Sequence, residues 1–387
     1  MAVLLAGAAW ACLIAWLILR AARQFRAHRA LPVGESASAE HSVAIIVPAR
    51  NEARNIGQCL SGLSAQRGLA AASSIFVIDD ASRDGTGEGV RRAALGDARI
   101  SLIEAGALPV GWMGKPYACW RGAMHANADW LCFIDADVRA EPELVAAAIA
   151  AAERDGIDML SLTPFQELGS FWERLIIPAG LVLVACAKDL RLIDDPASPE
   201  ISANGQFLLI RRAVYAAVGG HRAVRDEICE DKALAARLKR AGYRFRLLGA
   251  EHLARTRMYR DLGTLWEGLS KNAVEIMGDG PSTIAVATAG MVFAWASLLL
   301  PLLAVMGLTQ QPSLAAAMGC GLALLGSVAV VGVHIGTARH FRIAMTYGLL
   351  FPLAYTAVAV LAWHSAALRR GGRVSWKGRT YELDRKA

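Results

Sequence analysis

The stretch Trp130-Leu131-Cys132-Phe133-Ile134-Asp135-Ala136-Asp137 decides the fold, because an apolar run ends in two aspartates separated by one residue. A short apolar run between polar flanks is typical of a buried strand. Ionised carboxylates at such a strand end are costly unless positive charge meets them. Oxygen ligands at this spacing suit Mg²⁺ or Mn²⁺, with positions left open for substrate phosphates. The alternative is a pair of solvated loop aspartates before a helix that starts near Glu141-Pro142.

Further strands are predicted upstream of this stretch. Branched apolar runs cover residues 43–47, 75–78 and 100–103, and helical patterns lie over 53–66, 85–94 and 117–126. This alternation predicts an α/β fold built from β-α-β units, with a mostly parallel central sheet and helices on both faces. In such open sheets the ligand lies at the carboxyl ends of the strands, so the residues there are the candidate site.

The predicted strand ends are acidic and contain few glycines. The first ends in Pro48-Ala49-Arg50-Asn51-Glu52 and the second in Asp79-Asp80. A dinucleotide site would need a glycine fingerprint after the first strand, and no glycine comes before Gly57 there, which argues against NAD or FAD. Carboxylates accept hydrogen bonds from ribose hydroxyls or a base N–H, whereas they repel bare phosphate. A metal at the later Asp-Ala-Asp motif would offset this repulsion.

Two other charged groups are candidates for the same site. Lys115, in Gly111-Trp112-Met113-Gly114-Lys115, is either a point positive charge near a diphosphate or an ordinary solvated lysine. Glu230 and Asp231 lie at the start of a helix predicted over 232–241. The helix dipole alone could explain them there, or one of them acts as general base toward an acceptor hydroxyl.

The ends of the chain predict membrane segments. Residues 2–19 are free of charge and are followed by Arg20 and further arginines, which predicts an uncleaved anchor whose C-terminal flank is cytoplasmic. Runs over 284–308, 314–335 and 343–368 are also long enough to span. Basic groups at 339–342 and at 369–373 both predict a cytoplasmic location, so one segment, the Pro352-containing third, is expected to be re-entrant or interfacial.

These features predict a multi-pass protein of a bacterial-type inner membrane with a cytoplasmic catalytic domain. The expected boundaries are an anchor at 1–20, a basic linker at 21–41, the domain at 42–279, a membrane region at 284–368 and a basic tail at 369–387. An apolar stretch over 171–187 is either an interfacial helix with Trp172 at the head-group level or a buried core helix. The seven scattered cysteines indicate a reducing compartment, and no nucleic-acid partner is expected.

Four motifs in order resemble the family 2 glycosyltransferases of the GT-A fold: Pro-Ala-Arg-Asn-Glu (48–52), Ile-Asp-Asp-Ala-Ser (78–82), Asp-Ala-Asp (135–137) and Glu-Asp (230–231). Gly-Trp-Met-Gly-Lys (111–115), Asn-Gly-Gln-Phe (204–207), Gly-Gly-His (219–221) and the tail Trp-Lys-Gly-Arg-Thr-Tyr (376–381) narrow the resemblance. The combination looks like the hopene-associated and carotenoid-type membrane glycosyltransferases.

The resemblance implies a role for each matching residue. Asp231 would be the catalytic base with Glu230 beside it, and Asp137 with Asp135 would hold the divalent cation, Mg²⁺ or Mn²⁺. The nucleotide-sugar site would be formed by Pro48, Ala49, Glu52, Asp79, Asp80, Lys115 and Asp135. The acceptor side would include Asn204, Gly205, Gln206 and Trp266.

The implied reaction is inverting transfer of one sugar from a nucleotide sugar, in particular a UDP-sugar, to a lipid acceptor such as a hopanoid or carotenoid. The Gln-x-x-Arg-Trp signature of processive relatives is missing, and residues 265–272 read Leu-Trp-Glu-Gly-Leu-Ser-Lys-Asn instead, which favours a single transfer. Two alternatives stay open: a polysaccharide or polyprenyl-phosphate sugar transferase, and a non-catalytic membrane protein that binds nucleotide sugars.

Overall fold

The computed structural model describes residues 1–34 and 41–382, so parts of the predicted linker (35–40) and tail (383–387) lie outside the described residues. Its main sheet has seven strands in the order β3-β2-β1-β4-β8-β6-β9. Strand β8 runs antiparallel to β4 and β6, and the other neighbours are parallel. The strands of this sheet are β1 (Val43–Ala49), β2 (Ser74–Asp79), β3 (Ile100–Glu104), β4 (Trp130–Ile134), β6 (Met159–Thr163), β8 (Phe207–Arg211) and β9 (Phe245–Gly249).

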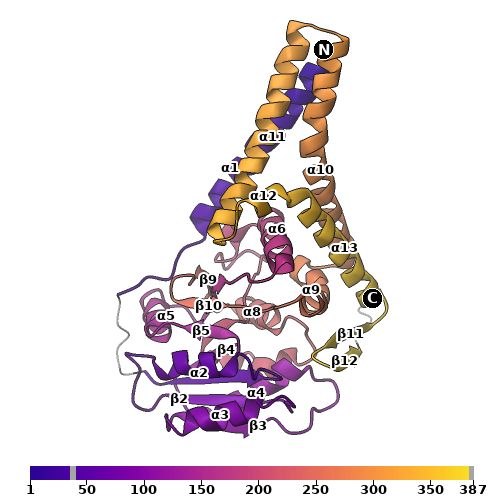
Figure 1. Cartoon of the computed structure of the whole chain (residues 1–387). Helices are drawn as coiled ribbons and strands as arrows, with labels where there is room; N and C mark the ends of the chain where they lie inside the picture. The colour runs from indigo at the N-terminus through magenta and orange to yellow at the C-terminus, as the bar shows by residue number, and fades with distance from the viewer. Residues whose placement is uncertain (35–40, 383–387) are drawn as a thin grey trace.

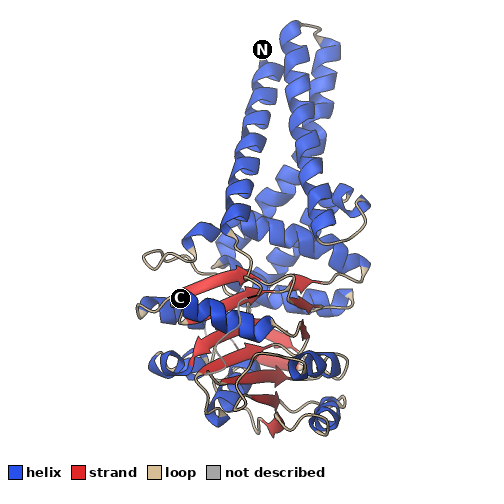
Figure 2. Ribbon diagram, turned by 90° about the vertical axis from the view of Figure 1, so that its left-hand side faces the viewer, coloured by secondary structure: helices blue, strands red, loops and turns tan. Residues whose placement is uncertain are grey.

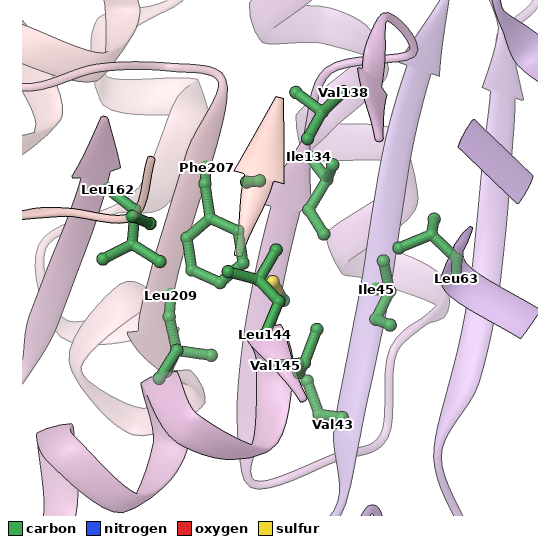
Figure 3. Packing of buried hydrophobic residues seen from close by; sticks show 14 of the residues in the cluster. Val43, Ile45, Leu63, Ile134, Val138, Leu144, Val145, Leu162, Phe207 and Leu209 are labelled. Atoms are coloured by element: carbon green, nitrogen blue, oxygen red, sulfur yellow. The ribbon is translucent and has the colours of Figure 1, made fainter. Parts of the chain in front are cut away.

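Helices cover both faces of this sheet, as the alternation of elements predicts (Figure 2). Side chains of β1 point alternately to two cores: Val43 and Ile45 to one, Ala44 and Ile46 to the other. Figure 3 shows the first core, where Leu63 and Leu144 pack on Ile45, Ile134 and Phe207. The helices on that face are α2 (Ile56–Ser64), α3 (Thr86–Ala94) and α5 (Leu144–Arg154); those on the other are α4 (Gly114–His125), α7 (Arg212–Ala217) and α8 (Glu230–Arg240).

The predicted strands and helices all occur, but one connection differs from the prediction. The helix expected near Glu141-Pro142 begins at Leu144, because β5 (Val138–Ala140) comes first. Strand β5 joins β10 (Ala254–Thr256) and β7 (Phe165–Gln166) in a second, three-stranded sheet. These strands are two or three residues long, too short for a period-two pattern to reveal.

Among the described residues, four helices are long and apolar enough to cross a membrane. Three of them, α1, α10 and α11, extend together away from the sheet, and the N-terminus lies at the far end of this bundle (Figure 1). The fourth, α13, stays at the base of the bundle, where it packs against α10, α9 and α6. These helices are α1 (Ala2–Ala27), α6 (Phe171–Ala187), α9 (Leu262–Met277), α10 (Gly280–Gln310), α11 (Leu314–His340) and α13 (Phe351–Arg370).

The run predicted over 343–368 is not one helix. It breaks at Leu350 between a short helix, α12 (Thr346–Leu349), and α13, whose first turn contains Pro352. Proline fits a first turn because its missing N–H has no helical partner there. Both basic groups flanking this run contact the block of residues 42–279 that contains the main sheet: His340 lies 3.8 Å from Glu251, and Arg369 lies 2.8 Å from Glu275. Both ends of the third segment therefore lie against residues of the range 42–279, and the re-entrant or interfacial arrangement stays a prediction.

Helix α6 joins the block to the bundle. Ser170 and Glu173 form a reciprocal capping box at its start, and the fully buried Glu173 also accepts two bonds from Arg257, at 3.0 and 3.1 Å. Residues 175–179 are buried, whereas Phe171 and Trp172 are exposed. The middle of the helix is therefore part of a core, whereas its first residues are exposed, and the interfacial role of Trp172 stays a prediction.

After α13 the chain returns to the block of residues 42–279 as a β-hairpin, β11 (Arg373–Trp376) and β12 (Arg379–Glu382). The two residues between the strands, Lys377 and Gly378, both have positive φ, +46° and +76°. Positive φ at both central positions defines a type I′ turn, whose twist matches that of the flanking strands. We refer to residues 376–379 as the hairpin tip.

Candidate active site

The carboxyl ends of β1, β2 and β4 meet at one edge of the sheet, because these strands are parallel and in register. Ala49 pairs with Asp79, and its carbonyl accepts the N–H of Asp80 at 2.8 Å. Strand β8 starts where β4 ends, so the N–H of Asp135 reaches the carbonyl of Gln206 at 3.2 Å. This geometry gathers the candidate residues from four separate parts of the sequence.

Lys115 is the centre of this edge. Its ammonium group lies 2.7 Å from Asp135 and 3.0 Å from Glu230, and it approaches the carbonyl of Gly205 at 3.4 Å. Burial alone would lower the pKa of Lys115, but the two carboxylates hold that pKa well above its ordinary value. The reading as an ordinary solvated lysine is therefore wrong: this side chain joins the Asp-Ala-Asp motif to the Glu-Asp motif.

Glu230 and Asp231 open helix α8 with different environments. Burial would raise the pKa of Glu230, but the ammonium group of Lys115 keeps it below its ordinary value. Burial, together with the neighbouring charge of Glu230, raises the pKa of Asp231 to about 6. Asp231 is oriented by the N–H of Gly205 at 2.6 Å and by that of Lys232 at 2.8 Å. Two adjacent carboxylates with separated pKa values suit different roles in proton transfer.

Asp137 lies beside this group without a protein partner for one of its oxygens. Its Oδ1 is buried and accepts no hydrogen bond from the described residues. Burial, then the charges of Asp135 and Glu52, raises the pKa of Asp137 to about 7. A divalent cation would satisfy the orphaned oxygen and reverse this shift. Within residues 1–34 and 41–382, no group of three or more His, Cys, Asp and Glu side chains is placed to hold a metal ion.

The segment 204–206 contacts both Asp135 and Asp231 through its backbone. Asn204 accepts the N–H of Gln206 at 3.0 Å and is held by Ser161, whose hydroxyl accepts the N–H of Asn204 at 2.8 Å. The side chain of Gln206 is buried and accepts bonds from Gln166 and Asn204. A Cβ at Gly205 would lie 2.9 Å from the Lys115 ammonium nitrogen and 3.2 Å from Asp231 Oδ2, so a side chain there would displace Lys115 from its present position.

The predicted nucleoside residues line the other side of this edge. Asp79 accepts the N–H of Ser82 at 3.0 Å and so closes its own turn, whereas Asp80 is buried. Pro48 and Ala49 end β1, and Glu52 follows on the loop, where it accepts a bond from Asn55 at 2.7 Å.

Two residues of the hairpin tip belong to the site although sequence reasoning gave them no role. Lys377 forms an ion pair with Glu52, and Arg379 forms one with Asp80. The Trp-Lys-Gly-Arg-Thr-Tyr motif was the signal, but nothing local shows which side chains it meets. Trp266 is separate from this group: its indole N–H donates to His364 of α13 at 2.9 Å, at the interface between α9 and α13.

Comparison with known proteins identifies the family that this part of the chain matches. Residues 44–179 match the sequence model of glycosyl transferase family 2. The chain carries a family 2 glycosyltransferase domain. The matched residues of this glycosyltransferase run from β1 into α6 and include Glu52, Asp80, Lys115, Asp135 and Asp137.

Relatives and a solved structure extend the similarity beyond the matched domain. The glycosyltransferase is 24% identical over 347 residues to a 4,4'-diaponeurosporenoate glycosyltransferase of Staphylococcus aureus (strain USA300), covering 89% of each chain. The protein of the same name in strain MRSA252 is 25% identical over 349 residues. A mannosyltransferase of Pyrobaculum calidifontis, solved with GDP-Man and Mn²⁺, superposes with a TM-score of 0.53 at 19% identity, over 92% of this chain and 99% of that one. The chain therefore has the GT-A fold.

Proposed function

We propose that this protein is a membrane-bound inverting glycosyltransferase that moves one sugar from a nucleotide-sugar donor to a lipid acceptor. The observation that carries the proposal is the bridge made by Lys115, whose ammonium group contacts both Asp135 and Glu230. It puts the base candidate Asp231 in the same cluster as the strand-end carboxylates that would receive the donor. A base within reach of a donor site is the arrangement that sugar transfer requires.

Asp231 acts as the general base in this proposal. The acceptor hydroxyl oxygen attacks the anomeric carbon, the bond from that carbon to the diphosphate oxygen breaks, and the hydroxyl proton passes to Asp231. The raised pKa of Asp231, about 6, keeps most of it ionised at neutral pH while making it a better proton acceptor than an ordinary aspartate. The N–H groups of Gly205 and Lys232 fix its orientation.

The donor is held by the strand ends. Asp80 or Asp79 receives the base, Pro48, Ala49 and Glu52 complete the nucleoside pocket, and Lys115 with Asp135 lies next to the diphosphate. Asp137 and Asp135 would hold a divalent cation, which supplies positive charge to the departing diphosphate. The orphaned oxygen of Asp137 supports this ligand assignment.

The acceptor side faces the membrane. The Staphylococcus relatives are named for a carotenoid acid, which supports a carotenoid or hopanoid acceptor for this chain. The 204–206 segment would lie next to the acceptor hydroxyl, and Trp266 would lie toward the membrane, since its indole meets α13. The exposed Phe171 and Trp172 at the base of the bundle suit the head-group level.

The membrane arrangement follows from the bundle. Helices α1, α10 and α11 cross an inner membrane, and α13 lies at the cytoplasmic interface with the catalytic domain on the same side. The arginines within the last turns of α1 support this orientation, since basic residues are retained in the cytoplasm. We keep the boundaries 42–279 for the catalytic domain and 284–368 for the membrane region.

The test is transfer from labelled UDP-sugars and GDP-sugars by the full chain, in native lipid extract with Mn²⁺. Asp231→Asn should lose nearly all transfer and retain donor binding, while Asp226→Asn, an exposed carboxylate of the preceding loop, should transfer normally. Wild-type turnover by Asp231→Asn would refute the base assignment. Label recovered in a polymer instead of an extractable lipid would refute the lipid acceptor.

A further inference from the structure

The hairpin tip contacts the donor side of the site with two cations. Lys377 donates to the carbonyl of Arg50 at 2.9 Å as well as pairing with Glu52, and Arg50 in turn donates to the carbonyl of Lys377 at 3.2 Å. Arg379 pairs with Asp80, whose side chain is 5% exposed. These contacts join the tail to the strand ends of β1 and β2, about 300 residues earlier in the chain.

The pocket has been shaped to admit this hairpin. A Cβ at Gly114 would lie 2.7 Å from Asp80 Oδ2 and 2.9 Å from a guanidinium nitrogen of Arg379, so a side chain at this position would displace their pair. Trp376 lies under the ammonium group of Lys271 of α9, 4.7 Å from its ring centroid. Tip residues are therefore fixed from two sides, by the strand ends and by α9.

The charges at this edge give the hairpin a role in donor binding. Glu52, Asp80, Asp135, Asp137, Glu230 and Asp231 would together repel a diphosphate. Lys115 is already bound between Asp135 and Glu230. Lys377 and Arg379 neutralise Glu52 and Asp80, and the charge of Lys377 also reaches Asp137. The hairpin thus adds positive charge to the donor side beyond that of Lys115, whose ammonium group is already paired with Asp135 and Glu230.

Lys377 and Arg379 each have more N–H hydrogen-bond donors than their ion pairs use. An ammonium group has three N–H donors, and the described contacts of Lys377 use two, to Arg50 and Glu52. A guanidinium has five, in a planar fork that matches phosphate oxygens. A cavity of about 380 Å³ lies between residues 108–113 and β12, and Arg379 is one of the residues that line it.

We propose that Lys377 and Arg379 are donor-binding residues, and that the hairpin tip forms the wall of the site that receives the nucleotide diphosphate. The inference rests on the proposed function and deepens it, since it adds a segment beyond the membrane region to the donor site. The opposite role would be a plug: if the tip only occupied Glu52 and Asp80, a nucleoside would have to displace it.

The experiment measures binding to the full chain in detergent with Mn²⁺, using UDP, GDP, uridine and guanosine as probes. The variants are Lys377→Met, Arg379→Gln and their combination. Arg373→Gln is the matched control, because it removes an exposed cation from the same hairpin away from the pocket. Arg379→Lys keeps the charge and guards against a folding defect, and thermal unfolding of each variant is measured in parallel.

The affinity for a nucleoside diphosphate, compared with that for its nucleoside, should distinguish a donor-binding role of the tip from a plug. We expect the double variant to weaken binding of the preferred nucleoside diphosphate by about tenfold or more, the scale of a charge-assisted hydrogen bond, and binding of its nucleoside by less than about threefold. Arg373→Gln should bind as wild type, and Arg379→Lys should recover most of the affinity. Equal or tighter binding by the double variant would overturn the proposal, and tighter nucleoside binding would identify a plug. A wild-type protein that binds neither diphosphate would refute the proposed function itself.

Discussion

Lys115 and Glu230 form an ion pair of 3.0 Å between the first turn of α4 and the first turn of α8. Glu230 is buried, and its helix also carries Asp231, so the pair sets the position of the proposed base relative to the sheet edge. A half-buried lysine thus connects the two halves of the proposed site.

Replacing Lys115 with Met should damage both stability and activity. Asp135 and Glu230 would lose their shared cation, and a buried charged group left without a partner lowers the free energy of unfolding by more than the roughly 1–3 kcal/mol of a neutral polar group. Thermal unfolding in detergent and the transfer assay would measure the two effects. Lys115→Arg keeps the charge and should retain more of the stability; equal stability of Lys115→Met and wild type would contradict the assigned bridge.

Transfer should fall as the pH falls through about 6. The pKa of Asp231 is raised, and a base works in its ionised form, so activity is present above that pKa and lost below it. At pH 5 about a tenth of Asp231 would be ionised, which predicts a roughly tenfold lower rate than at neutral pH. The rate is measured at saturating donor and Mn²⁺, so that binding does not limit it. A flat profile between pH 5 and 7 would exclude Asp231 as the titrating base.

Asp137→Asn should remove the dependence of nucleotide binding on metal. The variant keeps the shape of the side chain but loses the charge that a hard cation needs. We expect Mn²⁺ to strengthen UDP or GDP binding to wild type, with EDTA reversing the gain, and to have little effect on the variant. An unchanged Mn²⁺ titration would exclude Asp137 from the metal site.

The arrangement of the membrane helices is testable with single cysteines. Gln311 lies in the turn between α10 and α11, at the far end of the bundle, whereas Arg339 and Glu382 lie at its base. In a background without reactive native cysteines, Gln311→Cys should react with an impermeant maleimide from outside the cell. Arg339→Cys and Glu382→Cys should react only after the cytoplasmic side is opened. Labelling of Arg339 and Glu382 from opposite sides would mean that α13 crosses the membrane.

The sheet could be predicted because its signals are local. Each parallel strand is a short apolar run, and parallel strands place their polar ends at one edge, so Asp80 and Asp135 could be brought together without coordinates. The ion pairs of Lys115 needed the packing of α4 against α8. The partner of Asp80 could not be foreseen, because Arg379 lies 299 residues away and no periodicity links the two. The position of Trp266 depends on α13 in the same way.

The docked hairpin also bears on how the protein is made. Residues 42–279 are synthesised first, and Glu52 and Asp80 meet their cations only after the four helices α10 to α13 have been made. The proposed donor pocket would therefore be completed after the membrane helices. A fragment cut before α10 would contain the residues of the acidic edge but would lack Lys377 and Arg379, so we expect such a fragment to bind the donor poorly.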